Sequence, residues 1–184
     1  MFELGPAAEE MTRLIGGVDD DQLELRTTCA EWTVGDLLAH INQFAVVFTS
    51  NARKEPVEPP SELPHEWREA IPHHLDEMVL SWRDEAAWQG RVSAGGVEMD
   101  ARDNAVVAIE EITIHAWDLG TATGQQMQIT GGALDQIDRF FELFGDAGSG
   151  EGPFGPAAPV PADGSRWEHT LARTGRDPRD GARG

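Results

Sequence analysis

The chain has 184 residues, 40% of them hydrophobic and 26% charged, which are the proportions of a globular protein with one sizeable core. Its formal net charge of −19 makes nucleic acid and anionic membrane surfaces poor partners, because both repel an acidic protein. Cys29 is the only cysteine, which excludes an internal disulfide, and neither a membrane-spanning run nor a signal peptide is recognisable, so we expect a cytoplasmic protein.

Apolar residues at helical spacing predict two helices in the first third of the chain. The first covers residues 7–15 and ends at a pair of glycines. After a polar connection over 18–32, Thr33 is a suitable N-cap, with Asp36 three residues on as an approximate capping box. The second helix runs from 34 to about 48. Its apolar positions are Val34, Leu37, Leu38, Ile41, Phe44, Ala45 and Phe48.

A linker and a long third helix follow. Four prolines between residues 54 and 64 exclude regular structure there. Apolar spacing predicts the third helix over about 66–88, and Pro72 marks either a late start or a kink near its first turns. Residues 90–100 contain two adjacent glycines between valines, which predicts a small hairpin or an extended loop.

The fourth predicted helix, over about 102–123, is apolar almost all round and is therefore expected at the centre of the fold. A fifth helix over 131–144 has a single apolar stripe. Beyond it glycine and proline dominate, which predicts extended structure lying over the helices. The pattern indicates an all-α bundle in one domain over 1–184, with helices to about 146 and an irregular tail over about 147–184.

A carboxylate and an imidazole lie inside the apolar fourth helix. Glu111 and His115 are four residues apart, so their side chains lie one above the other on the same helix face. Burying a lone carboxylate is unfavourable unless a cation or strong donors compensate it. The pair supplies two of the three protein ligands of an open metal site. The alternative is a core histidine that is hydrogen-bonded to a nearby carboxylate without any metal.

His40 is the candidate third ligand, because it lies on the second predicted helix at the edge of the apolar stripe. Two imidazoles and one carboxylate suit Zn²⁺, with Ni²⁺ or Fe²⁺ as alternatives, and leave coordination positions open. Asp118, three residues past His115, is a candidate acceptor that orients an imidazole. An equally good interpretation of Asp118 is a polar residue near a helix end.

Other polar residues are interpreted structurally. Glu110 is expected to point away from the pair into solvent, because adjacent helical residues are about 100° apart. Cys29 is interpreted as a small, semi-buried residue, and as a reactive thiol only if its loop lies over the metal. His65, His73 and His74 are interpreted as surface residues, because adjacent histidines cannot both face one ion from a helix.

Two motifs resemble a known family. They are Cys29-x2-Trp32-Thr33-Val34-x2-Leu37-x2-His40 and Glu111-x3-His115-x-Trp117-Asp118-Leu119. Both resemble the DinB-like four-helix-bundle metalloproteins, and within them the metal-binding domain of mycothiol-dependent maleylpyruvate isomerase and its actinobacterial relatives. The tail, with Phe154-Gly-Pro and Gly175-Arg176-Asp177-Pro178, resembles the short members of that group. The resemblance spans nearly the whole chain.

The resemblance implies a DinB-like four-helix bundle with an extra C-terminal helix and an extended tail, and metal ligands at His40, Glu111 and His115. It also implies that the metal, most simply zinc, binds a small thiol such as mycothiol as a nucleophilic thiolate. The two-domain isomerases carry a second domain for which this chain leaves no room. We therefore expect thiol S-transfer to a small electrophile rather than the isomerase reaction.

Two alternatives come from other functional classes. One is a metal-binding or stress-related module that turns nothing over, and the other is a structural or interaction bundle whose polar pair fixes register without a metal. Bundles of this group often dimerise through helix faces, so a homodimer is also open. The sequence names no dedicated general acid or base.

Overall fold

The computed structural model describes residues 1–29, 31–94, 96–147 and 153–182 of the chain. Within these residues helices carry most of the fold and two short strands make the only sheet, which confirms the all-α prediction. No described helix is both long and apolar enough to cross a membrane. The α-helices are α1 (Gly5–Gly16), α2 (Val34–Arg53), α3 (Trp67–Ser81), α4 (Ala101–Thr123), α5 (Gly131–Phe144) and α6 (Arg166–Arg173), and the strands are β1 (Arg91–Ala94) and β2 (Val97–Asp100).

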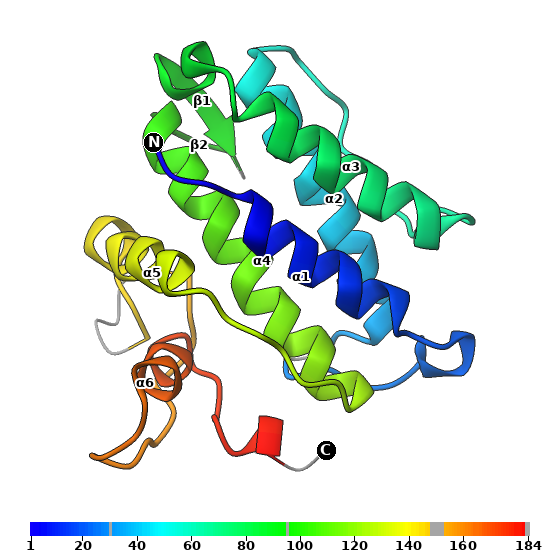
Figure 1. Ribbon diagram of the computed structural model, residues 1–184, viewed down its shortest axis with the longest axis vertical. Helices are drawn as coiled ribbons and strands as arrows, with labels where there is room; N and C mark the ends of the chain where they lie inside the picture. Colours follow the sequence, from blue (N-terminus) through cyan, green and yellow to red (C-terminus); the bar gives the residue numbers. More distant parts are fainter. Residues whose placement is uncertain (30, 95, 148–152, 183–184) are drawn as a thin grey trace.

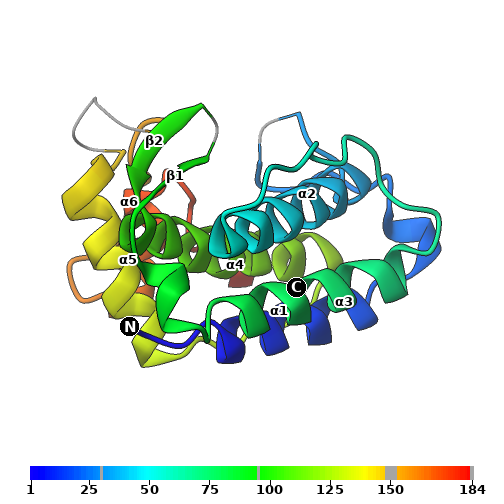
Figure 2. The same ribbon diagram turned by 90° about the horizontal axis from the view of Figure 1, so that it is seen from above.

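Helices α1 to α4 form a four-helix bundle (Figures 1 and 2). Both α1 and α2 pack against α3 and α4, so the four helices close around one hydrophobic core. Burial of each large apolar side chain stabilises the fold by about 1.5–3 kcal/mol. The fully buried side chains of this core include Met11, Leu14, Ile15, Leu37, Leu38, Ile41, Ile71, Leu75, Met78, Ile112 and Leu119.

Helix α4 is covered on two sides, as its apolar sequence predicted. One side faces the bundle, while on the other α5 packs against α4 and α6 packs against α5 (Figure 1). The second apolar cluster that results joins Val106, Ile114 and Trp117 of α4 to Ile137, Phe140, Phe141 and Leu171. Few side chains of α4 therefore reach solvent, and five of its polar residues are buried: Asn104, Glu110, Thr113, His115 and Asp118.

The third helix is shorter than the sequence predicted. Helix α3 ends at Ser81, and a separate 3₁₀ turn over Glu85–Trp88 follows. Asp84 caps this turn, because its carboxylate accepts a hydrogen bond from a backbone N–H of the turn at 2.9 Å. The apolar spacing continues past the end of α3 because two tryptophans beyond it are buried. Trp82 is the C-cap of the helix, and Trp88 ends the 3₁₀ turn.

Residues 91–94 and 97–100 form a hairpin, which is one of the two structures that the sequence predicts for this segment. Strands β1 and β2 are antiparallel, with Val92 opposite Met99 in their register. The hairpin contacts α4 through both strands and α2 through β1. It therefore lies beside both helices, at the end where α4 begins (Figure 2).

The tail is not wholly irregular, because it contains α6. Ser165 begins this helix with a capping box: its hydroxyl accepts from the backbone N–H of Glu168 at 3.2 Å, and the Glu168 carboxylate accepts from the backbone N–H of Ser165 at 2.7 Å. The serine and glutamate of this capping box are visible in the sequence, but the many glycines and prolines around them led to the prediction of irregular structure. Helix α6 of the tail thus packs against α5.

The capping box of α2 gives a stability prediction. The backbone N–H of Asp36 donates to the Thr33 hydroxyl at 3.2 Å, and the Asp36 carboxylate accepts from the backbone N–H of Thr33 at 2.9 Å. Thr33→Ala removes the hydroxyl and is expected to lower the free energy of unfolding by about 1 kcal/mol in urea denaturation. Thr33→Ser keeps the hydroxyl and should stay close to wild type. Equal losses in both variants would show that the methyl group, not the cap, is what matters.

Candidate metal centre

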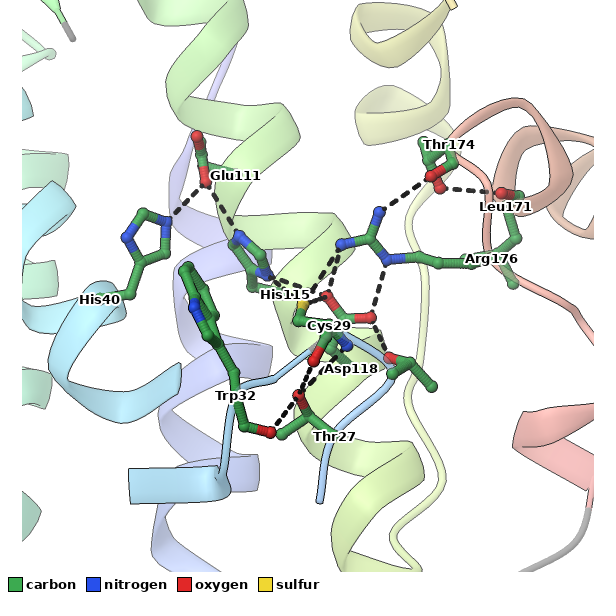
Figure 3. A network of polar contacts seen from close by, with 11 residues as sticks. Thr27, Cys29, Trp32, His40, Glu111, His115, Asp118, Leu171, Thr174 and Arg176 are labelled. Carbon is green, nitrogen blue, oxygen red and sulfur yellow. Dashed lines mark hydrogen bonds and ion pairs between the residues drawn. The ribbon is translucent and has the colours of Figure 1, made fainter. Parts of the chain in front are cut away.

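His40, Glu111 and His115 meet between two helices of the bundle. His40 comes from α2, and the other two come from one face of α4 (Figure 3). One oxygen of Glu111, Oε2, lies 3.2 Å from Nε2 of His40 and 3.1 Å from Nε2 of His115. One ligand atom from each of the three side chains lies within 4.8 Å of the others. The structure thus places the three residues together, and their binding of a metal stays a prediction.

This cluster opens into a large cavity. The cavity has a volume of about 970 Å³, and all three side chains line it. The His40 side chain is 25% exposed, that of Glu111 is 27% exposed and that of His115 is 11% exposed. A small molecule in the cavity can therefore reach an ion held by these atoms.

Trp32 covers the cluster on one side. Its ring centre lies 4.8 Å from that of His40 and 6.0 Å from that of His115. The loop that carries Trp32 leads directly into α2, where the Thr33 cap fixes the start of the helix seven residues before His40. Trp32 therefore limits the approach of water to the two imidazoles.

The His115 ring is oriented by a second carboxylate. Its Nδ1 lies 2.9 Å from Oδ2 of Asp118, and since a carboxylate only accepts hydrogen bonds, Nδ1 carries a proton. Burial lowers the pKa of His115, but its contacts with Asp118, Cys29 and Glu111 outweigh burial and hold the pKa well above its ordinary value. Positive charge is thus favoured between His115 Nε2 and Glu111 Oε2, where either a proton or a divalent cation supplies it.

Glu111 is an ionised carboxylate in this environment. Burial raises the pKa of its carboxyl group, but the hydrogen bonds from His115 and His40 outweigh burial and bring the pKa below its ordinary range. Two imidazoles on one carboxylate form the nitrogen and oxygen donor set that zinc accepts. The residues present therefore fit a divalent cation.

Glu110 is not the solvated charge that the sequence predicted. It is 5% exposed and lines the same cavity as Glu111. Burial, and then the adjacent Glu111 carboxylate, raise the pKa of Glu110 to about 8, so it is mostly protonated at neutral pH. The prediction failed because it took the direction away from Glu111 to lead to solvent, whereas the bundle covers one side of α4 and α5 covers the other.

Arg176 is a site residue that sequence reasoning missed. Its Nε and Nη2 each lie 2.7 Å from one oxygen of Asp118, which forms a two-pronged ion pair (Figure 3). Asp118 is fully buried and Arg176 is 13% exposed. The two residues are 58 positions apart and share no motif spacing, so only the docked tail brings them together.

Cys29 offers a second group of ligand atoms, with His115 and Asp118. Its Sγ lies 3.2 Å from Oδ2 of Asp118 and 3.8 Å from Nδ1 of His115. Asp118 is already compensated, however, because Arg176 donates to both of its oxygens and the Thr28 hydroxyl donates to one. The group of His40, Glu111 and His115 therefore fits a cation better than the group of Cys29, His115 and Asp118.

The other histidines singled out in the sequence lie elsewhere. His65 is exposed beside Glu66, with its Nδ1 2.9 Å from the Glu66 carboxylate. His74 is half-buried, with its Nδ1 2.8 Å from the side-chain oxygen of Asn42. Neither these two nor His73 belongs to a metal-ligand group among the residues that the structure describes.

Comparison with known proteins identifies related sequences and folds. Residues 4–120 match the model of the mycothiol maleylpyruvate isomerase N-terminal domain. Two proteins of Mycobacterium tuberculosis, named Uncharacterized protein MT0763 and Uncharacterized protein Rv0738, are each 26% identical over 186 residues, which cover 92% of this chain and 93% of theirs.

Two solved structures share the fold. The crystal structure of the mycothiol-dependent maleylpyruvate isomerase aligns with a TM-score of 0.55 at 20% identity, and that of a histidine-to-alanine mutant with 0.54 at 16%. Each alignment covers 73% of this chain and 64% of the isomerase chain. The chain described here thus spans about two thirds of that enzyme's length.

Proposed function

The chain belongs to the family of the mycothiol maleylpyruvate isomerase N-terminal domain, and we propose that it transfers a small thiol of the mycothiol type to an electrophile. His40, Glu111 and His115 would hold a divalent metal, with zinc as the first candidate and nickel or iron as alternatives. The observation that carries the proposal is the convergence of three ligand atoms on the wall of a cavity of about 970 Å³. A bound divalent cation lowers the pKa of a coordinated thiol, so that thiolate forms near neutral pH.

The surrounding residues have defined parts in this proposal. Asp118 holds the proton on Nδ1 of His115 and so directs Nε2 toward Glu111. Arg176 neutralises Asp118, which keeps that buried carboxylate from attracting the ion. Trp32 excludes water from one side of the imidazoles. In the transfer itself the thiolate sulfur would form a bond to carbon while the bond between that carbon and the leaving group breaks. The leaving group takes the electron pair, and the proton lost when the thiol ionises passes to solvent.

The test is metal-dependent conjugation. Protein loaded with one equivalent of zinc is mixed with mycothiol or N-acetylcysteine and 1-chloro-2,4-dinitrobenzene, and formation of the thioether is followed by absorbance. We expect a rate at least about tenfold above the uncatalysed reaction, which corresponds to about 1.4 kcal/mol of barrier. A chelator should abolish the increase and added zinc should restore it.

Two results would contradict the proposal in different ways. Stoichiometric zinc binding without any rate increase would leave a metal-binding module that does not turn over these substrates. Failure to bind zinc, nickel or iron would instead leave a structural or interaction bundle. Elemental analysis of the same samples separates the two outcomes.

A further inference from the structure

The cavity beside the candidate metal site is walled mainly by apolar side chains from several elements. Phe44 and Phe48 come from α2, Val107 from α4, and Phe140 and Phe144 from α5. Phe154 of the tail closes the same wall, with its ring centre 5.7 Å from that of Phe140. These rings lie on different helices around one space, so a flat apolar molecule in it would contact rings on more than one side.

The described residues that line the cavity offer no unpaired lysine or arginine to an anionic molecule. Arg176 is the only lysine or arginine among the described lining residues. Its Nε and Nη2 are both engaged by Asp118, and its Nη1 donates to the backbone oxygen of Thr174 at 3.3 Å. The other titratable groups among these lining residues are Cys29, His40, His115, Glu110 and Glu111. Both imidazoles are paired with Glu111, whose Oε2 lies 3.2 Å from Nε2 of His40 and 3.1 Å from Nε2 of His115. An entering carboxylate would lose its hydration without gaining an unpaired cation.

Charge at the candidate metal site does not change this conclusion. A divalent cation that carries Glu111 and one thiolate is formally neutral, since each ligand contributes one negative charge. The chain as a whole has a net charge of −19, which also opposes the approach of anions. The remaining attraction in the cavity is apolar burial and ring contact.

We propose that the electrophile taken by this cavity is uncharged and largely apolar, with an aromatic ring as the favoured class, and that carboxylates are excluded. This inference rests on the proposed thiol transfer, because it names the second substrate of that site. The cavity volume of about 970 Å³ lies at the upper end of the range for small-molecule sites, so a thiol and a ring compound have room together.

The test is direct binding of a matched pair of unreactive probes, 2-naphthamide and 2-naphthoate, which share a ring system and differ in charge. Affinities are measured by calorimetry with the full chain, both metal-free and loaded with zinc in the presence of excess 2-mercaptoethanol, an uncharged thiol that completes the formally neutral site. We expect the amide to bind at least about tenfold more tightly than the carboxylate in both forms. Equal affinities, tighter binding of the carboxylate, or no binding of the amide would overturn the inference.

A lysine introduced into the lining of the cavity provides a second test of the inference. Val47 is half-buried on α2 and lines the cavity, so Val47→Lys supplies the cation that is lacking. This variant should raise the affinity for 2-naphthoate by about tenfold and remove the preference for the amide. Its matched control is Val46→Lys: Val46 is also half-buried but lines a separate small cavity with Thr49 and Ser50. An unchanged preference in Val47→Lys, or the same shift in both variants, would contradict the assignment.

Because the probes do not react, this result is independent of catalysis. If the amide binds but no conjugate forms from thiol and electrophile, the proposed function fails while the binding preference stands. If conjugation occurs but the carboxylate binds as well as the amide, the substrate class is wrong and the proposed function stands.

Discussion

Glu111→Gln is expected to lower the affinity of the protein for zinc by more than about 100-fold. Loss of an outer residue that merely orients a ligand costs about 10–100-fold in metal affinity. Glu111 is proposed to bind directly, and it is the single anion that lies within 3.2 Å of both imidazoles. Glutamine keeps the shape but removes the negative charge. Competition with a chromogenic zinc chelator, supported by elemental analysis, measures the change.

The neighbouring carboxyl provides a matched control. Glu110→Gln makes the same chemical change one residue earlier on α4 and in the same cavity. The pKa of Glu110 is raised to about 8, so a neutral amide resembles the protonated form that already predominates at neutral pH. Zinc affinity should stay close to wild type in this variant. Comparable losses at both positions would show that the general negative charge of the cavity, rather than Glu111 itself, attracts the metal.

Variants of His40 and Cys29 distinguish between the two groups of candidate ligands, because each of these residues belongs to only one group. His40→Ala should weaken zinc binding together with Glu111→Gln, because His40 belongs only to the group with Glu111 and His115. Cys29→Ser should leave zinc affinity nearly unchanged, since Cys29 belongs only to the group with His115 and Asp118. The reverse pattern would place the ion between Cys29 and Asp118 and would exclude the proposed ligand set.

The candidate ligands were predictable because helix periodicity shows on which face of its helix each of them lies. Glu111 and His115 lie one turn apart on a continuous helix, and the strong periodicity of α2 fixes the side on which His40 lies. The same one-dimensional reasoning failed at Glu110, because helix geometry shows that Glu110 and Glu111 point in different directions but not whether the second direction leads to solvent. Burial of Glu110 depends on α5 and the tail, which dock through tertiary contacts.

The tail was the least predictable part for the same reason. A high content of glycine and proline predicts irregular chain, yet Ser165 and Glu168 cap a helix that packs through Leu171. Nothing in the local sequence around Arg176 points to Asp118, since the pairing depends on the path of the tail across α5. Long-range ion pairs of this kind are decided by the assembled fold, whereas caps and helix faces are decided by neighbours in sequence.

Arg176→Met is expected to lower the free energy of unfolding of the metal-free protein by about 3 kcal/mol. Removing one partner of a buried ion pair typically costs 3–5 kcal/mol, because the remaining charge is left uncompensated. The lower end applies here, since His115 and Thr28 still contact the fully buried Asp118. Urea denaturation followed by circular dichroism measures the loss.

The exposed pairs of α6 supply the comparison for this variant. Arg166→Met makes the same replacement at a residue that pairs with Asp135 and Asp138, at 2.8 and 2.6 Å, on the surface. Its denaturation midpoint should hardly move, because water screens exposed pairs. Equal effects of the two replacements would mean that the Arg176 pair is energetically an ordinary surface contact.

A double variant distinguishes charge compensation from lost packing. Asp118→Asn removes the buried charge, so adding it to Arg176→Met should recover part of the lost stability if the uncompensated carboxylate is the cause. Zinc affinity should nevertheless stay about 10–100-fold below wild type in the double variant, because His115 has lost its charged acceptor. Recovery of stability without recovery of zinc affinity would separate the two effects of Asp118. In the folded chain that carboxylate both fastens the tail to α4 and orients a candidate metal ligand.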